Sequence, residues 1–219
     1  MKQLIILFSA LVILIGSGCV DNSPSSTSST SSYEKISTAI EILPVEALSS
    51  DEEQGLVFMR EEEKLARDIY QSLYDIWSLP VFNNIANSEQ THTSVIAKLL
   101  ERYSIDDPAL NTNVGEFQNS ALQTLYDTLY AQGSSSRLDA LLVGAEIEEV
   151  DLIDINTYLD TVDNQDISLV YQNLMKGSRN HLRSFVQMLV AEGIEYTPLH
   201  LSPLEYELII STPKETGIY

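Results

Sequence analysis

The strongest chemical signal in the sequence is a glutamate and a histidine three residues apart, Glu89 and His92 in NSEQTHTSV. On a helix this spacing places both side chains on one face, on neighbouring turns, so both can reach one metal ion. That face is otherwise apolar, and burying titratable groups is costly unless they are paired or coordinate a cation. We predict that Glu89 and His92 bind a metal. The alternative is a buried pair with a purely structural role.

Three other stretches offer candidate ligands on apolar helical faces. His181 in GSRNHLRSF and Glu149 in AEIEEVDLI fall within such faces, with Glu146 as the reserve candidate beside Glu149. In REEEKLARDIY, periodicity places Glu62 near the centre of the apolar arc and Glu63 nearer its edge. Four helices that turn such groups toward a common interior can build a binuclear carboxylate site. Its oxygen and nitrogen ligands suit iron, with manganese as an alternative.

Helical periodicity and capping residues predict an all-α fold without strands. Ser50 with Glu53 is typical of a capping box at the start of the first long helix, and Pro80 forces the break that follows this helix. Short connections make the helices of two pairs antiparallel, and a longer crossover between the pairs carries an extra short helix. The result is a four-helix bundle of two hairpins. The predicted helices cover residues 50–77, 81–103, 117–131, 136–162 and 166–192, followed by a short terminal helix from Ser202.

The first 38 residues are predicted to lie outside the folded domain. In residues 1–19, an apolar run and small residues precede Cys19, which predicts a signal peptide with a lipoprotein cysteine. A lipid on Cys19 would anchor the exported protein to a membrane, in the cell envelope or at the outer surface of a prokaryotic cell. A plain signal peptide with an incidental cysteine is the alternative. Residues 20–38 are rich in Ser and Thr, which predicts a flexible linker, and the helical domain is predicted to span residues 40–219.

Composition argues against several other classes of function. The 32 acidic and 12 basic residues give a formal charge of −20, which disfavours nucleic-acid binding because phosphate contacts need clustered Lys and Arg. The single cysteine excludes an internal disulfide and a cysteine-based zinc or iron–sulfur site. A serine hydrolase is disfavoured because the chain has no G-x-S-x-G elbow.

The first of these helices resembles the ferritin-like superfamily. Glu63 followed by Ala66 and Tyr70 is similar to the first-helix motif of rubrerythrins, ferritins and bacterioferritins, in which Ala and Tyr follow a metal-ligand glutamate at the same spacing. This resemblance favours Glu63 over Glu62 as a ligand. It also implies that Tyr70 hydrogen-bonds a ligand glutamate.

The resemblance extends over about residues 45–212. Glu89-Gln-Thr-His92 is similar to the second-helix E-x-x-H motif of the superfamily, and the pair Glu146 and Glu149 resembles the paired third-helix glutamates of rubrerythrin. The wider pattern resembles an uncharacterised ferritin-like family, domain of unknown function 2202. The fold implied is the ferritin-like four-helix bundle.

The sequence departs from the ferritin pattern on the fourth helix. Where di-iron ferritins carry E-x-x-H, this chain reads Ser178-Arg179-Asn180-His181, so one ligand carboxylate is missing. Glu146 could replace it, or one metal position could be weaker or empty. No C-x-x-C module for electron transfer, as in rubrerythrins, is present in the sequence.

Three functions follow from this reading. The first is a membrane-tethered di-iron or di-manganese oxidoreductase acting on peroxide, dioxygen or Fe²⁺. The resemblance implies that Glu89 and Glu149 bridge the metals and that Glu63, His92 and His181 are terminal ligands. The second is metal binding or sensing without turnover, and the third is a metal-free structural bundle. Small oxidants or metal ions are the expected partners, and a homodimer is an open alternative.

Overall fold

The computed structural model describes residues 27–219, so the predicted signal peptide with Cys19 lies outside the described part. This part is all-helical, as predicted. Among residues 27–219 no helix combines the length and apolarity needed to cross a membrane. The helices are α1 (Thr27–Ile42), α2 (Ser50–Trp77), α3 (Pro80–Arg102), α4 (Ser120–Gly133), α5 (Arg137–Leu159), α6 (Gln165–Ala191) and α7 (Pro203–Ile210).

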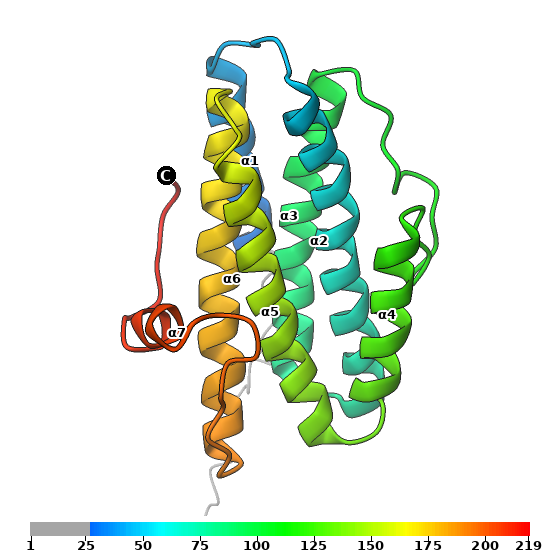
Figure 1. Cartoon of the computed structure of the whole chain (residues 1–219), viewed down its shortest axis with the longest axis vertical. Coiled ribbons are helices and arrows are strands. Elements are labelled where there is room, and N and C mark those ends of the chain that lie inside the picture. Colours follow the sequence, from blue (N-terminus) through cyan, green and yellow to red (C-terminus); the bar gives the residue numbers. More distant parts are fainter. Residues whose placement is uncertain (1–26) are drawn as a thin grey trace, which may run out of the picture.

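Four long helices form a bundle of two antiparallel hairpins, α2 with α3 and α5 with α6 (Figure 1). Only Ser78 and Leu79 separate α2 from α3, and the short link forces the chain to turn back on itself. Helix α2 also packs against α5, and α3 against α6, so the four helices surround one interior. Helix α4, on the crossover between the hairpins, covers the outer side of α2 and α5.

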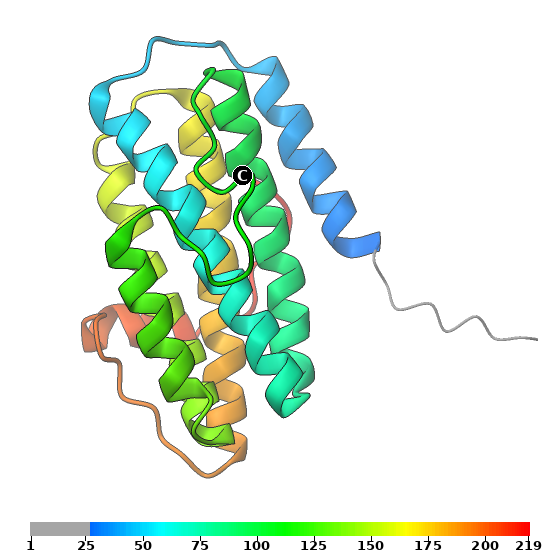
Figure 2. The ribbon, with the colours of Figure 1, turned by 90° about the vertical axis from the view of Figure 1, so that its right-hand side faces the viewer.

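Helix α1 begins within the segment that the sequence predicts to be a flexible linker. It packs against α3 and α6 and lies along the side of the bundle (Figure 2). Its Ile36 and Ile40 are buried in the core, which stabilises a helix whose Ser/Thr-rich composition alone does not favour order. The folded part therefore begins earlier than the predicted boundary at residue 40.

The capping box of α2 lies one residue earlier than predicted, at Ser49 and Glu52. The Glu52 carboxylate also accepts hydrogen bonds from the backbone N–H groups of Asp163 and Asn164, just before α6. One buried carboxylate thus caps α2 and ties it to the second hairpin.

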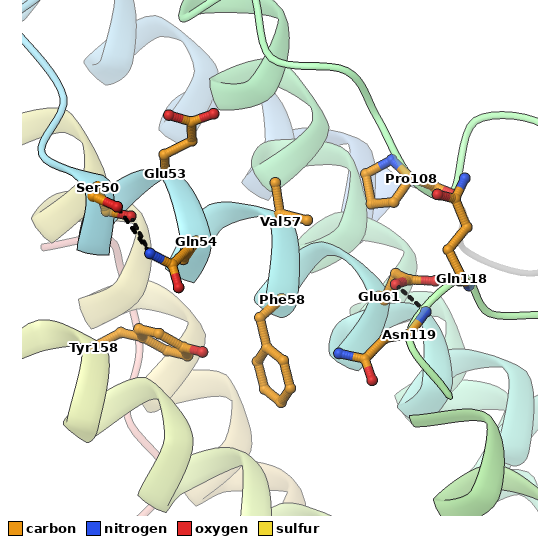
Figure 3. Close-up of a pocket in the computed structure, with 10 residues that line it drawn as sticks. All are labelled: Ser50, Glu53, Gln54, Val57, Phe58, Glu61, Pro108, Gln118, Asn119 and Tyr158. Atoms are coloured by element: carbon orange, nitrogen blue, oxygen red, sulfur yellow. Dashed lines mark hydrogen bonds between the residues drawn. The ribbon is translucent and has the colours of Figure 1, made fainter. Parts of the chain in front are cut away.

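The crossover between the hairpins is fixed to α2 by buried charged side chains. Lys64 pairs with Asp68 at 2.6 Å and donates to the carbonyl oxygen of Asn113. Glu61 accepts the backbone N–H groups of Gln118 and Asn119 at 2.5 and 3.0 Å. Figure 3 shows this junction, where the Glu61 carboxylate borders a cavity of about 590 Å³ and points to the crossover. Its oxygens are already hydrogen-bonded, so we assign this junction a structural role.

The core consists of two apolar clusters, one toward each end of the bundle. The first includes Tyr70, Phe82 and Phe185, and the second includes Met59 and Leu99. A band of buried polar residues lies between them. Because apolar side chains cover this band on both sides, its charged groups are largely removed from water.

Candidate metal centre

Two groups of buried ligand-type side chains meet in the polar band. Glu63, Glu89 and His92 form one, and Glu89, Glu148 and His181 form the other. Within each group the ligand atoms lie within 4.8 Å of one another. Four different helices contribute, so the group exists only once both hairpins have packed together.

Glu89 is the centre of the arrangement because it belongs to both groups. Its Oε2 lies 2.7 Å from Nδ1 of His92, and its Oε1 lies 2.7 Å from Nδ1 of His181. The two imidazole rings are 5.6 Å apart between centroids. Each carboxylate oxygen of Glu89 therefore serves a different histidine.

Each histidine meets a second carboxylate from another helix. Nδ1 of His92 lies 3.0 Å from Oε2 of Glu63 on α2. Nδ1 of His181 lies 3.4 Å from Oε2 of Glu148 on α5. The two groups thus have matching ligand atoms. Each half of the centre contains one imidazole nitrogen, one carboxylate that belongs to that half alone, and one oxygen of the shared Glu89.

Burial and charge shift the pKa values of these groups strongly. Burial raises the pKa of Glu89, but the two adjacent histidines outweigh it and lower the pKa below its usual value. Burial raises the pKa of Glu63 to about 7, against the opposing effect of His92. Burial alone would lower the pKa of His181, yet Glu89 and Glu148 raise it to about 10. The neighbouring carboxylates thus raise the pKa of both histidines against the opposing effect of burial.

Three consecutive glutamates of α2 face three different surroundings. Glu61 binds the crossover, Glu63 belongs to the metal-type group, and Glu62 is buried toward Asp151 and Asp154 of α5. Burial, followed by the charges of these two aspartates, raises the pKa of Glu62 well above its usual value. The structure therefore brings Glu63, not Glu62, to the histidines.

On α5 the structure places Glu148 in the group and leaves Glu149 outside it. Glu149 is fully buried on another face, where it accepts hydrogen bonds from the Tyr196 hydroxyl at 2.6 Å and from the N–H of His200 at 2.7 Å. The N–H groups of Leu199 and Leu201 donate to it as well. Periodicity selected Glu149 because it is buried, but the segment after α6 buries it, not the bundle interior.

Glu146 also lies outside the group. Its Oε1 is 3.4 Å from Nε2 of His200, a partly exposed residue in the segment after α6. It does not supply the carboxylate that Ser178 lacks. Glu146 and Glu149 thus both face the segment after α6 and lie outside the two groups of ligand-type side chains.

A family model described as "Uncharacterized protein domain (DUF2202)" matches residues 52–213. The chain belongs to the DUF2202 family. It is 50% identical over 179 residues to "Uncharacterized protein MJ0754" from Methanocaldococcus jannaschii, covering 82% of this chain and 97% of that relative. It also resembles the solved structure described as "Crystal structure of hypothetical protein MJ0754 from Methanococcus jannaschii DSM 2661", with a TM-score of 0.77, 51% identity, and coverage of 79% of this chain and 99% of that one. The match to the DUF2202 model includes all residues of both groups.

Groups outside the two triads hold their ligand atoms in place in this DUF2202 chain. The Tyr70 hydroxyl donates to Oε1 of Glu148 at 2.5 Å, which leaves Oε2 for the histidine side. Nε2 of His181 lies 2.9 Å from the Ser88 hydroxyl. Such partners fix the orientation of metal ligands. Tyr70 was expected from the resemblance to bond a ligand glutamate, whereas nothing in the sequence singled out Ser88.

The donor set fits divalent metal ions. Two ligand atoms at right angles, each about 2.1 Å from one ion, are separated by about 3 Å. The nitrogen–oxygen distances of 2.7, 3.0 and 3.4 Å match this separation. In addition, Oε1 of Glu63 is buried and receives no hydrogen-bond donor among residues 27–219. A cation would satisfy it.

A polar cavity of about 1010 Å³ lies between α3 and α6 and reaches both histidines. Its wall is rich in amide side chains, and the C-terminal tail forms one side. The tail is held by Lys176, which donates to the carbonyl oxygen of Gly217, and by Arg179, which pairs with Glu215 at 2.5 Å. The amides are Asn83, Asn84, Asn87, Asn173 and Asn180.

Proposed function

We propose that this protein is a ferritin-like oxidoreductase with a dinuclear metal centre, iron in the first instance, acting on Fe²⁺, peroxide or dioxygen. The position of Glu89 carries the proposal, since each of its oxygens lies 2.7 Å from a different histidine. A carboxylate between two otherwise equivalent ligand sets is the arrangement expected of two neighbouring ions. The two-hairpin topology supports the ferritin-like assignment.

The side chains would divide the work as follows. Glu63 and His92 would hold one ion, Glu148 and His181 would hold the other, and Glu89 would contribute to both. Two redox-active ions would supply electrons to, or accept them from, a small substrate. Tyr70 orients Glu148, and the apolar clusters on either side keep bulk water from the carboxylates. The amide-lined cavity gives an ion or a small oxidant a polar route to the histidines.

Metal content and turnover test this function. The purified protein loaded with Fe²⁺ without oxygen should contain about two ions per chain. Substitution His92→Ala should abolish tight binding in its half, while Glu146→Gln, a carboxylate on α5 outside the centre, should leave the content unchanged. Oxidation of Fe²⁺ or consumption of peroxide by the loaded protein should follow. A folded protein that takes up no metal would contradict the proposal.

Metal binding without turnover is the second candidate. Ser178 favours it, because the residue one turn from His181 on α6 offers a hydroxyl instead of a carboxylate. In that case two-ion or one-ion loading would occur but Fe²⁺ and peroxide would not turn over. A metal-free structural bundle is the third candidate, and it predicts that His92→Ala leaves the metal content unchanged at zero.

We further propose that the protein is tethered to the cell envelope through lipid on Cys19. The sequence supports this, because small residues precede the cysteine at the end of an apolar run. Mass spectrometry of the protein from native membranes should find Cys19 as a lipid-bearing N-terminus. An unmodified chain starting elsewhere would contradict the tether without affecting the metal centre.

A further inference from the structure

The polar band extends over two neighbouring turns of the bundle. Glu148 and His181 face each other across α5 and α6 on one turn. Asp151 and Ser178 face each other on the next, because each is three residues from its counterpart on the same helix. Helices α3 and α5 run in the same direction (Figure 1), so this second turn is level with His92.

Asp151 brings a buried carboxylate with a free oxygen to this turn. Its side chain is almost fully buried, and its Oδ2 accepts a hydrogen bond from the Ser178 hydroxyl. Its Oδ1 is buried and receives no hydrogen-bond donor from any residue of the described chain. A buried carboxylate oxygen of this kind is costly unless a cation or a proton meets it.

The group formed by Glu63, Glu89 and His92 also contains a buried carboxylate oxygen without a hydrogen-bond donor. Oε1 of Glu63 is likewise buried without a donor among residues 27–219, as are both carboxylate oxygens of the neighbouring Glu62. Burial, followed by the charges of Glu63, Glu148 and Glu89, raises the pKa of the Asp151 carboxyl well above its usual value. A positive charge between Asp151 and Glu63 would satisfy both oxygens.

Resting on the metal centre proposed above, we propose that Asp151 is a ligand of the ion held by Glu63 and His92, and that Ser178 fixes its orientation. Helix α5 then supplies one carboxylate to each ion, Glu148 and Asp151. The hydroxyl of Ser178 leaves room for the aspartate, which a longer acidic side chain at 178 would occupy.

Charge balance favours the same assignment. With neutral histidines, three carboxylates would leave two divalent ions with one uncompensated positive charge. Addition of Asp151 gives four negative charges against four positive ones. In a band covered by apolar clusters on both sides, a net charge is strongly disfavoured. The fourth carboxylate would remove this net charge and so favour binding of the second ion.

Titration of the metal-free protein with Co²⁺ tests the assignment, because the ligand field gives a visible spectrum independent of turnover. The native protein should take up about two ions. Asp151→Asn, nearly identical in shape, should take up about one and lose the spectral component that His92→Ala also removes. The control Glu146→Gln should keep about two. Ser178→Ala should keep the carboxylate but weaken the second ion by about 10- to 100-fold, as loss of an orienting partner does.

The outcomes separate the two proposals. If Asp151→Asn takes up about two ions with the native spectrum, Asp151 is not a ligand and the dinuclear centre stands. If the native protein takes up no Co²⁺, both proposals fail. Should Asp151→Asn not fold, Ser178→Ala decides, and unchanged affinity for both ions would overturn the role of Asp151.

Discussion

Gly177 on α6 lies directly against the imidazole of His92 on α3. A Cβ added at residue 177 would fall 2.4 Å from Cε1 and 2.5 Å from Nε2 of that ring. These separations are far shorter than carbon and nitrogen atoms tolerate without movement. The glycine is therefore what allows the His92 ring to fit against α6, with its Nδ1 turned to Glu63 and Glu89.

Gly177→Ala should consequently displace the His92 ring and weaken metal binding in that half by at least about 10-fold, as loss of ligand orientation does. Isothermal titration with Co²⁺ measures the affinity. Gly133→Ala is the matched control, because its added Cβ would meet Leu73 side-chain atoms at 3.0 Å at the end of α4, away from the centre. Equal effects of both variants would show that the change is one of packing alone.

Substitution of two adjacent glutamates on α5 should affect different properties, the metal content in one case and the stability of the fold in the other. Glu148→Gln should lower the metal content because it removes the carboxylate that only the group with His181 contains. Glu149→Gln should leave the metal content unchanged but lower the free energy of unfolding by about 2 kcal/mol, since an amide replaces an acceptor of four hydrogen bonds. Metal analysis and urea unfolding measure the two effects. A loss of metal in Glu149→Gln would contradict the site described here.

Tyr70→Phe should weaken metal binding while the fold is retained. The ring packs among Phe82 and Phe185, and only the hydroxyl that donates to Glu148 is removed. We expect a loss of affinity of about 10- to 100-fold. Tyr171→Phe is the control, since the Tyr171 hydroxyl is buried in the other apolar cluster without a hydrogen-bond partner among residues 27–219. If both variants bind metal like the native protein, the hydroxyl of Tyr70 does not orient a ligand.

The C-terminal tail should detach from α6 in acid. The Arg179 hydrogen bonds, with a further contribution from Arg183, lower the pKa of Glu215 from 4.5 to about 2. A lowered pKa stabilises the fold above pH 4.5, and this contribution is lost as the pH falls toward 2. Because Glu215 is partly exposed, we expect about 1 kcal/mol or less.

Unfolding of the native protein and Glu215→Gln at pH 6 and pH 3 measures this contribution. The stability difference between the two proteins should be larger at pH 6 than at pH 3. An equal difference at both pH values would show that the pair of Glu215 with the arginines does not stabilise the tail.

The sequence by itself determined the helices α2 to α7 and one pair of candidate metal ligands. Five of the six predicted helices start within about two residues of their observed positions, and the crossover helix starts three later, because periodicity, capping residues and Pro80 act locally. Glu89 and His92 come together for the same reason, since three residues on one helix fix their relative position whatever packs around them. The all-α class and the two hairpins follow from the lengths of these local elements.

Tertiary structure decided which residues join that pair. Glu148 and Glu149 are neighbours on a helix that is buried on nearly all sides, by α2, α4 and α6 and by the segment after α6. Because α5 is buried on nearly all sides, the burial pattern of its sequence does not indicate which face is turned to the bundle interior. Only the packing shows that Glu149 faces the segment after α6. The order of α1 likewise depends on α3 and α6, which cover Ile36 and Ile40. Asp151 opposite Ser178 is also a contact between helices, and spacing along one chain segment cannot specify it.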